Sequence, residues 1–160
     1  MIGTASSQRG GALVQQEGAH YVVDHSDPNY VQQLLDLTGG RGFDLILEMK
    51  TDINLAKDLK LVAPSGRVVL IGAKELGEEG SGRVEINPLD ALFKNAEILG
   101  LFIRMVPAAE VARIKAAIFA GLENGTLRPI VGQEMPLAEA IKAHEAIGKS
   151  GAYGKIILIP

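Results

Sequence analysis

Two serines, a glutamine and an arginine follow the first apolar segment of the chain, from Ser6 to Arg9. Hydroxyl groups and a guanidinium group suit phosphate, because the hydroxyls donate hydrogen bonds and the arginine adds positive charge. In a dinucleotide-binding sheet the corresponding strand usually ends in Asp or Glu, which holds the ribose 2′-hydroxyl and would repel a 2′-phosphate. If the chain has that fold, Ser6 and Arg9 favour NADP over NAD. A simpler interpretation stays open, in which Ser6 caps the next helix and Arg9 is a solvated surface charge.

The composition limits the classes of protein to which the chain can belong. Its 160 residues are 47% hydrophobic and 22% charged, which predicts one compact globular domain or slightly more. The net charge of −3, with no basic stripe, argues against a nucleic-acid partner. Without cysteine, and with only three histidines, the segment is expected to bind no metal. We see no signal peptide and no apolar stretch of membrane-spanning length, so we expect no membrane partner and a cytoplasmic location.

Short apolar segments alternate with longer amphipathic segments along the whole chain. The expected strands are residues 2–5, 20–24, 43–49, 66–73, 96–103, 129–135 and 155–159. The expected helices are a first one that opens within 6–11, followed by 29–38, 54–62, 87–95, 108–125 and 137–150. This alternation predicts an α/β fold with a doubly wound, mostly parallel sheet and helices on both faces. The Glu- and Gly-rich residues 74–83 are expected to form an exposed, mobile loop.

In such a sheet, ligands bind beyond the carboxyl ends of the strands. The loops of interest are therefore those that follow Ala5, Asp24, Met49, Ile71 and Ile103. These loops contain most of the residues that we consider for binding below.

Several segments, in order and over essentially the whole chain, carry a family resemblance. They are GTASS, QEGAHYVVDH, DLILEM with NLAKDL, GRVVLIG, VEINPLDALFKN with ILGLFI, PIVGQEMPL with AHEAI, and SGAYGKIIL. Together they resemble the zeta-crystallin-like NADPH:quinone oxidoreductases of the medium-chain dehydrogenase/reductase superfamily. The resemblance implies a Rossmann-like sheet that is incomplete, because the first strand and its Gly-rich turn are missing from this chain.

The missing strand would be the central one of that sheet, between residues 2–5 and residues 44–48. Both neighbours would lose a hydrogen-bonding partner, so we expect the chain to be the C-terminal part of a longer polypeptide, or the gap to be filled by another chain. The resemblance further implies two domains. Residues 1–125 would be a partial dinucleotide-binding domain, and residues 126–160 would return to a GroES-like substrate domain.

The resemblance also implies roles for individual residues in binding NADPH. Ser6 and Arg9 match the surroundings of the adenosine ribose phosphate, and His25 matches a position beside the adenosine, although a solvated turn histidine would look the same. Asn54 matches an amide that contacts the cofactor, or it is the N-cap of the helix that follows. The nicotinamide half would be approached by two segments: Ile71, Gly72, Ala73 and Lys74, and Leu101, Phe102 and Ile103.

The implied activity is hydride transfer from NADPH to a quinone or a conjugated carbonyl, without zinc. Two alternatives stay open: a non-catalytic nucleotide-binding or structural protein, and a relative of the enoyl reductases or zinc alcohol dehydrogenases. No catalytic residue stands out, since Glu48 is at most a polar contact and His144 a surface or structural residue. The strand at 96–103 would pair with its copy to form a homodimer. Lys50, where we would expect a neutral turn residue, is interpreted as exposed, and the loop from Lys74 to Arg83 is longer than the family's usual one.

Overall fold

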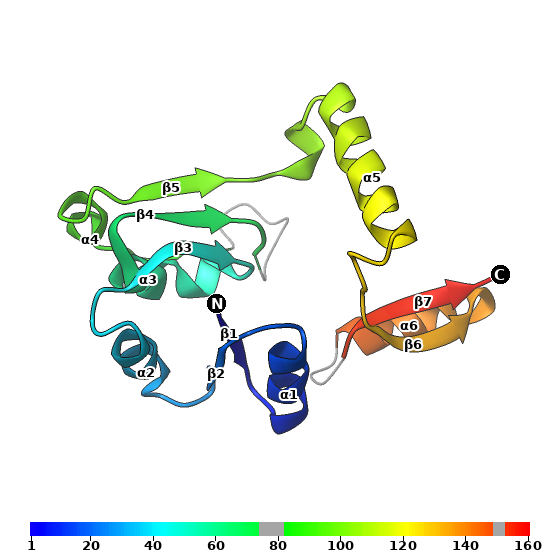
Figure 1. The fold of residues 1–160 in the computed structure, drawn as a ribbon, viewed down its shortest axis with the longest axis horizontal. Helices are drawn as coiled ribbons and strands as arrows, with labels where there is room; N and C mark the ends of the chain where they lie inside the picture. The colour runs from blue at the N-terminus through cyan, green and yellow to red at the C-terminus, as the bar shows by residue number, and fades with distance from the viewer. Residues whose placement is uncertain (74–81, 149–152) are drawn as a thin grey trace. The chain divides into compact units, whose positions relative to one another are not determined.

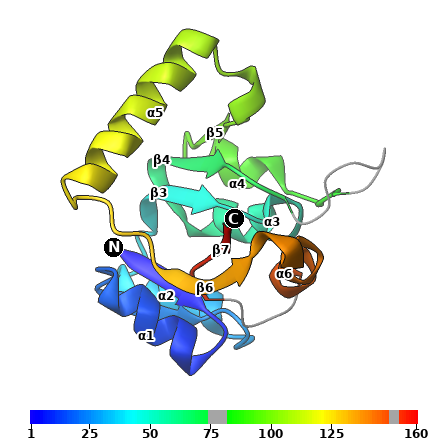
Figure 2. The same ribbon diagram turned by 90° about the vertical axis from the view of Figure 1, so that its right-hand side faces the viewer.

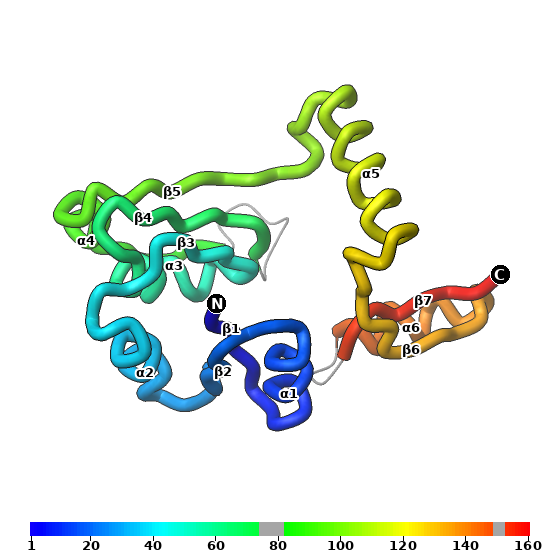
Figure 3. Tube along the Cα trace, viewed as in Figure 1, coloured from blue at the N-terminus to red at the C-terminus, as the bar shows by residue number. Residues whose placement is uncertain are grey.

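The computed structural model describes residues 1–73, 82–148 and 153–160. The chain divides into two compact units, one made of residues 1–22 and 106–160 and the other of residues 23–105. Strand and helix alternate along the chain, as the tube in Figure 3 lets the reader follow from the N-terminus. This confirms the α/β class expected from the sequence. The predicted mobile loop at residues 74–83 lies largely outside the described residues, as does Lys74.

A three-stranded parallel sheet is the centre of the second unit. Its strands are β3 (Phe43–Glu48), β4 (Val62–Leu70) and β5 (Glu97–Gly100), and they lie side by side in that order (Figure 1). The register pairs Ile46 with Val68 and Val68 with Ile98. The parallel order was expected. β5 ends at Gly100 and is shorter than the predicted strand at 96–103, and residues 103–105 form a 3-10 turn instead.

The helices of this unit are α2 (Tyr30–Leu37), α3 (Thr51–Leu61) and α4 (Pro88–Leu92). Leu59 of α3 is fully buried and belongs to a cluster with Leu55, Val62 and Val68, against which Ile46 of β3 and Ala91 of α4 also pack. The core of the unit therefore lies between α3 and one face of the sheet. On the other face the side chain of Leu47 is 62% exposed.

Side chains and a proline stabilise the start of α4 and the end of α3. Pro88 occupies the first turn of α4, where its missing N–H costs nothing, and Asn87 accepts a hydrogen bond from the N–H of Leu89 at 3.1 Å. At the end of α3, the ammonium group of Lys94 donates to the carbonyls of Leu59 and Lys60 at 2.9 and 2.7 Å. A cation is favourable there because the last carbonyls of a helix lack partners and carry partial negative charge.

Two small two-stranded sheets complete the strands, one of β1 and β2 and the other of β6 and β7. The elements of the first unit are β1 (Ile2–Ala5), α1 (Gln8–Gln16), α5 (Ala108–Glu123), β6 (Val131–Pro136), α6 (Ala140–Ile147) and β7 (Lys155–Ile159). The division of the sequence between the two units falls within β2 (Tyr21–Asp24). β6 and β7 are parallel, and α6 follows β6 after a 3-10 turn (Figure 2). Among the described residues, no helix is both long and apolar enough to cross a lipid bilayer.

β1 and β3 belong to separate sheets. Among the described residues, no strand hydrogen-bonds to both of them.

Candidate functional site

The carboxyl ends of β3 and β4 and the start of α3 form a compact hydrogen-bonded cluster. The carbonyl of Glu48, at the end of β3, accepts hydrogen bonds from the N–H of Ile71 at 2.9 Å and from that of Gly72 at 3.4 Å. In return, the N–H and the hydroxyl of Thr51 donate to the carbonyl of Gly72 at 3.0 and 2.8 Å. The two loops that follow neighbouring parallel strands are therefore held to each other.

Gly72 is required by this close approach. A Cβ atom at that position would lie 2.7 Å from the carbonyl oxygen of Met49, which is too near for any side chain. The glycine thus lets the loop after β4 lie directly against the loop after β3. Gly72 therefore does more than end β4, because it sets how closely the two loops can approach.

The side chain of Glu48 lies inside the cluster and connects it to α3. Only 8% of Glu48 is exposed, and its Oε1 accepts hydrogen bonds from the backbone N–H of Lys50 and, at 3.3 Å, from the side-chain amide of Asn54. Asn54 is the fourth residue of α3, which begins at Thr51 with Lys50 as its N-cap, so the alternative in which Asn54 is the N-cap is wrong. Its amide is instead oriented by Glu48. The side chain of Lys50 is exposed, as expected.

Asp58 is a second buried carboxylate beside Glu48, and the sequence reading missed it. Asp58 is 5% exposed, and its Oδ2 makes no hydrogen bond to any described residue. Burial, and then the neighbouring carboxylate of Glu48, raise the pKa of Asp58 to about 7. The signal that could have found it is the spacing of Asn54 and Asp58, which puts both on one face of the helix.

The other residues expected at the nicotinamide half follow the neighbouring strand. The N–H of Leu101 donates to the carbonyl of Leu70 at 2.9 Å, so the segment after β5 begins beside the end of β4. Leu101, Phe102 and Ile103 are 50%, 57% and 56% exposed, and Ile71 is 37% exposed. The structure thus gathers Asn54, Ile71, Gly72, Ala73 and the segment from Leu101 at one edge of one sheet. His25 is exposed in the turn after β2, next to Asp24, whose pKa is lowered mainly by hydrogen bonds from Ser26.

Ser6 and Arg9 belong to the other unit and are exposed at the start of α1. The capping hydroxyl of α1 is that of Ser7, which accepts a hydrogen bond from Gly10 N–H at 3.2 Å, so the alternative in which Ser6 caps the helix is wrong. The Ser7 hydroxyl also lies 3.1 Å from the hydroxyl of Tyr153, and the guanidinium carbon of Arg9 lies 4.3 Å from the centre of that ring. Arg9 is therefore stacked on an aromatic ring rather than freely solvated.

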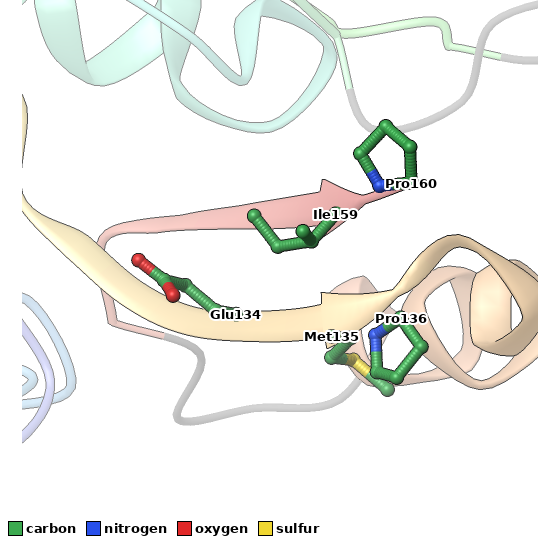
Figure 4. A pocket seen from close by; sticks show the side chains of 5 residues that line it. All are labelled: Glu134, Met135, Pro136, Ile159 and Pro160. Carbon is green, nitrogen blue, oxygen red and sulfur yellow. The ribbon is translucent and has the colours of Figure 1, made fainter.

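Two recesses in the first unit are lined by none of the residues expected at the site. One, of about 250 Å³, lies at the ends of β6 and β7 and is lined by Glu134, Met135, Pro136, Ile159 and Pro160 (Figure 4). The other, of about 400 Å³, is lined by residues of β1 and α1 together with Ile130, Tyr153 and Gly154. Neither recess is lined by Ser6 or Arg9. Among the described residues, no three His, Cys, Asp or Glu side chains are grouped so that they could hold a metal ion.

Comparisons with known proteins agree on the family. Residues 17–158 match the zinc-binding dehydrogenase family. The chain is 38% identical to human quinone oxidoreductase and 39% identical to the enzyme of that name from Sus scrofa, in each case over 99% of this chain and 46% of the relative. A Burkholderia 2-haloacrylate reductase is 24% identical over the whole chain and 48% of its own length. The chain thus spans about half the length of the curated relatives it matches.

Solved structures show the same fold. A quinone oxidoreductase from Pseudomonas syringae has a TM-score of 0.81 and 25% identity, with 99% of this chain and 48% of that chain covered. An NAD-dependent alcohol dehydrogenase has a TM-score of 0.81 and 26% identity, with coverage of 99% and 43%.

Proposed function

The chain belongs to the zinc-binding dehydrogenase family, and from this premise we propose that it forms the nucleotide-binding part of a zinc-independent NADPH-dependent reductase of quinones or conjugated carbonyls. The observation that carries the proposal is the whole-chain likeness, at 38% identity, to a protein named quinone oxidoreductase. The relative named 2-haloacrylate reductase supports a conjugated carbonyl as an alternative acceptor.

The residues at the sheet edge fit the nicotinamide half of such a cofactor. Exposed apolar side chains of Ile71, Leu101 and Phe102 offer a surface for the face of a flat ring. Asn54 supplies an amide that Glu48 orients. Gly72 keeps the loop backbone free of side-chain bulk, so a ligand could approach it closely.

Ser6 and Arg9 supply chemistry that fits a ribose 2′-phosphate. The hydroxyl of Ser6 is exposed, while that of Ser7 is occupied as the helix cap. An arginine that stacks on an aromatic ring keeps its N–H edge available for phosphate oxygens. These two residues are the basis for proposing NADPH rather than NADH.

The chemistry of the bound cofactor is transfer of a hydride to the acceptor. The residues described here would bind and orient that cofactor and exclude water from its nicotinamide face. We nominate no catalytic acid from this chain, because an electrophilic quinone carbonyl needs little proton assistance. His144, the histidine nearest the C-terminus, is exposed on α6.

The proposed organisation follows the family resemblance. Residues 1–125 would be the dinucleotide-binding part and residues 126–160 would belong with the substrate domain, in a protein of the cytoplasm. β5 is the last strand in the described order of its sheet, and Ile98 and Leu99 are 40% and 43% exposed. These features support a homodimer in which β5 pairs with its copy.

The experiment is titration of the intact protein with NADPH and NADH, comparing the unaltered protein with Arg9→Glu. Charge reversal at a 2′-phosphate site should weaken NADPH binding by at least about tenfold and leave NADH within about twofold. Arg113→Glu is the matched control, because Arg113 is an exposed arginine on α5 paired with Glu110 at 3.4 Å. Equal weakening of both cofactors in Arg9→Glu would remove Arg9 from the phosphate site, and absence of NADPH binding and of quinone or enone reduction in the unaltered protein would refute the proposed function.

A further inference from the structure

The two buried carboxylates Glu48 and Asp58 stand in unequal surroundings. Oε1 of Glu48 accepts two hydrogen bonds, from the N–H of Lys50 and from the amide of Asn54. Hydrogen bonds from neutral donors favour the charged form of a carboxylate. Asp58 receives no such bond at Oδ2, although only 5% of the residue is exposed. Of the pair, Asp58 is therefore the group that favours the protonated form.

A proton between these two groups would satisfy both of them. Asp58 lies one helical turn after Asn54 on the same face of α3, and the amide of Asn54 donates to Oε1 of Glu48, so the two buried carboxylates belong to one cluster. Two carboxyl groups can hydrogen-bond only if one of them carries a proton, since both are otherwise acceptors. Without that proton, two negative charges would face each other in a region shielded from water, which is costly.

Other charged groups around α3 are engaged elsewhere or act weakly on Asp58. Lys57, on the same helix, lowers the pKa of Asp58, but less than burial and Glu48 raise it, and its ammonium group lies 5.2 Å from the ring centre of Tyr30. The other charged side chains on the elements next to α3 interact with other partners. Asp36 accepts from Gln32, Asp44 pairs with Arg41, and Arg67 pairs with Glu97. Lys94 donates to the carbonyls of Leu59 and Lys60 and is also near the charge of Asp90.

We propose that Glu48 and Asp58 share one proton, and that this proton keeps Asn54 and the loop of Ile71–Ala73 in place, so that cofactor binding weakens when the proton is lost. The inference rests on the proposed function for its last step. Glu48 transmits the effect through two routes: its side chain orients Asn54, and its carbonyl accepts from Ile71 and Gly72. Glu48 and Asp58 are thus positioning residues, which act through Asn54 and the loop.

The loss of the proton has a defined pH range and direction. The pKa of Asp58 lies at about 7, so the pair holds its proton at pH 6 and has lost it at pH 9. Loss of the proton should move Glu48 away from Asp58 or α3 away from β3, and either movement disturbs the bonds to Asn54. When the binding-competent arrangement becomes less populated, the apparent dissociation constant rises in proportion.

The proton can be detected without any cofactor. At about pH 6, infrared spectroscopy of the intact protein in D₂O should show the carbonyl stretch of a protonated carboxylic acid, which lies at a higher frequency than the bands of a carboxylate. The band should vanish by about pH 9. Asp58→Asn should remove the band, and Glu48→Gln should lower the pH at which the band vanishes, because burial still raises the pKa of Asp58 when residue 48 is neutral. Both substitutions keep shape, and Glu48→Gln keeps the Oε1 atom that accepts from Lys50 and Asn54.

The positioning effect is read by hydrogen exchange at Ile71 and Gly72 and by NADPH titration. In the unaltered protein, protection of these amides, corrected for the intrinsic pH dependence of exchange, should fall between about pH 6 and pH 9, and the Kd for NADPH should rise by at least about threefold. In Asp58→Asn and Glu48→Gln, amide protection and the Kd for NADPH should each change with pH by less than about half of the change in the unaltered protein. Asp36→Asn, a neutralised exposed carboxylate on α2, is the matched control and should behave like the unaltered protein.

Each failure has a separate meaning. Absence of the infrared band, or its persistence in Asp58→Asn, would overturn the shared proton. A band with unchanged protection and an unchanged NADPH profile in both variants would overturn the positioning role. Absence of NADPH binding at every pH would refute the proposed function and the cofactor step of the inference, while the band and the exchange data would still test the pair itself.

Discussion

The dependence of stability on pH gives a quantitative test of how Asp58 is buried. The pKa of Asp58 is raised from 3.8 to about 7 in the folded protein. Between those two values the folded protein holds a proton that the unfolded chain has released, so the free energy of unfolding falls as the pH rises. The stabilisation linked to this proton is fully present below about pH 4, and it is lost as the pH rises to about 7.

The size of the effect follows from the shift. One pH unit corresponds to about 1.4 kcal/mol for one proton, so the full shift sets an upper bound of about 4 kcal/mol. Relaxation of the protein and entry of water around the pair reduce this figure, and we expect about 2 to 4 kcal/mol between pH 4 and pH 7. Above pH 7 the contribution of Asp58 should be constant.

The assay is denaturant-induced unfolding of the intact protein from about pH 5 to pH 8, with Asp58→Asn measured in parallel. Subtracting the unfolding free energies of the two proteins at each pH cancels the other titrating groups. Among these groups are the exposed Asp24 and Asp44, whose pKa values are lowered in the folded protein. Their contributions to stability are lost only as the pH falls below about 4. The difference should decline by about 1 kcal/mol per pH unit up to pH 7 and then level off. If the free energy of unfolding depended on pH in the same way for the unaltered protein and for Asp58→Asn, the argument would be refuted. The control Asp36→Asn should show the same pH dependence as the unaltered protein.

Three further changes test other parts of the fold. Leu59→Ala should cost about 2 to 5 kcal/mol in unfolding free energy, because Leu59 is fully buried, and a cost below about 1 kcal/mol would contradict the assigned core. Gly72→Ala should weaken NADPH binding, measured by titration, because the new methyl would lie 2.7 Å from the carbonyl of Met49; unchanged affinity would mean that the loop is not part of the site. Arg67→Ala should cost less than about 1 kcal/mol and lose its effect at high salt, since its 2.7 Å ion pair with Glu97 is half exposed; a larger, salt-independent cost would refute this.

The sequence predicted the strands and helices of the second unit well because their patterns are local. Residues 43–49 were expected to form a strand, and β3 covers Phe43–Glu48. β4 begins at Val62, earlier than the predicted start at Gly66, because α3 passes into it without a loop. The register is irregular between Phe43 and Leu45, opposite Ser65 with its positive φ of 57°, and this irregularity separates the early part of β4 from the apolar run.

The site was less predictable because its contacts join residues distant in sequence. The family resemblance selected Asn54 and Ile71–Ala73, and the structure holds them near one another through Glu48. The carboxylate of Asp58 could not be assigned from its neighbours alone, because an acidic residue in a helix is usually solvated. The spacing of Asn54 and Asp58 places both on one face of α3, but the packing of that face against β3, which buries Asp58, cannot be derived from the spacing.

The contact of Lys94 with the end of α3 has a consequence for how the protein opens. The ammonium group bonds the last carbonyls of the helix, and the carbonyl of the same residue accepts from Ser65 N–H at 2.7 Å. One residue on the segment that leads to β5 therefore connects to both α3 and the irregular start of β4. Partial unfolding of β5 would have to break these bonds as well, so β5 and α3 should open as one cooperative unit rather than by independent fraying. β5, an exposed edge strand of four residues, should therefore resist local unfolding about as well as the buried helix α3.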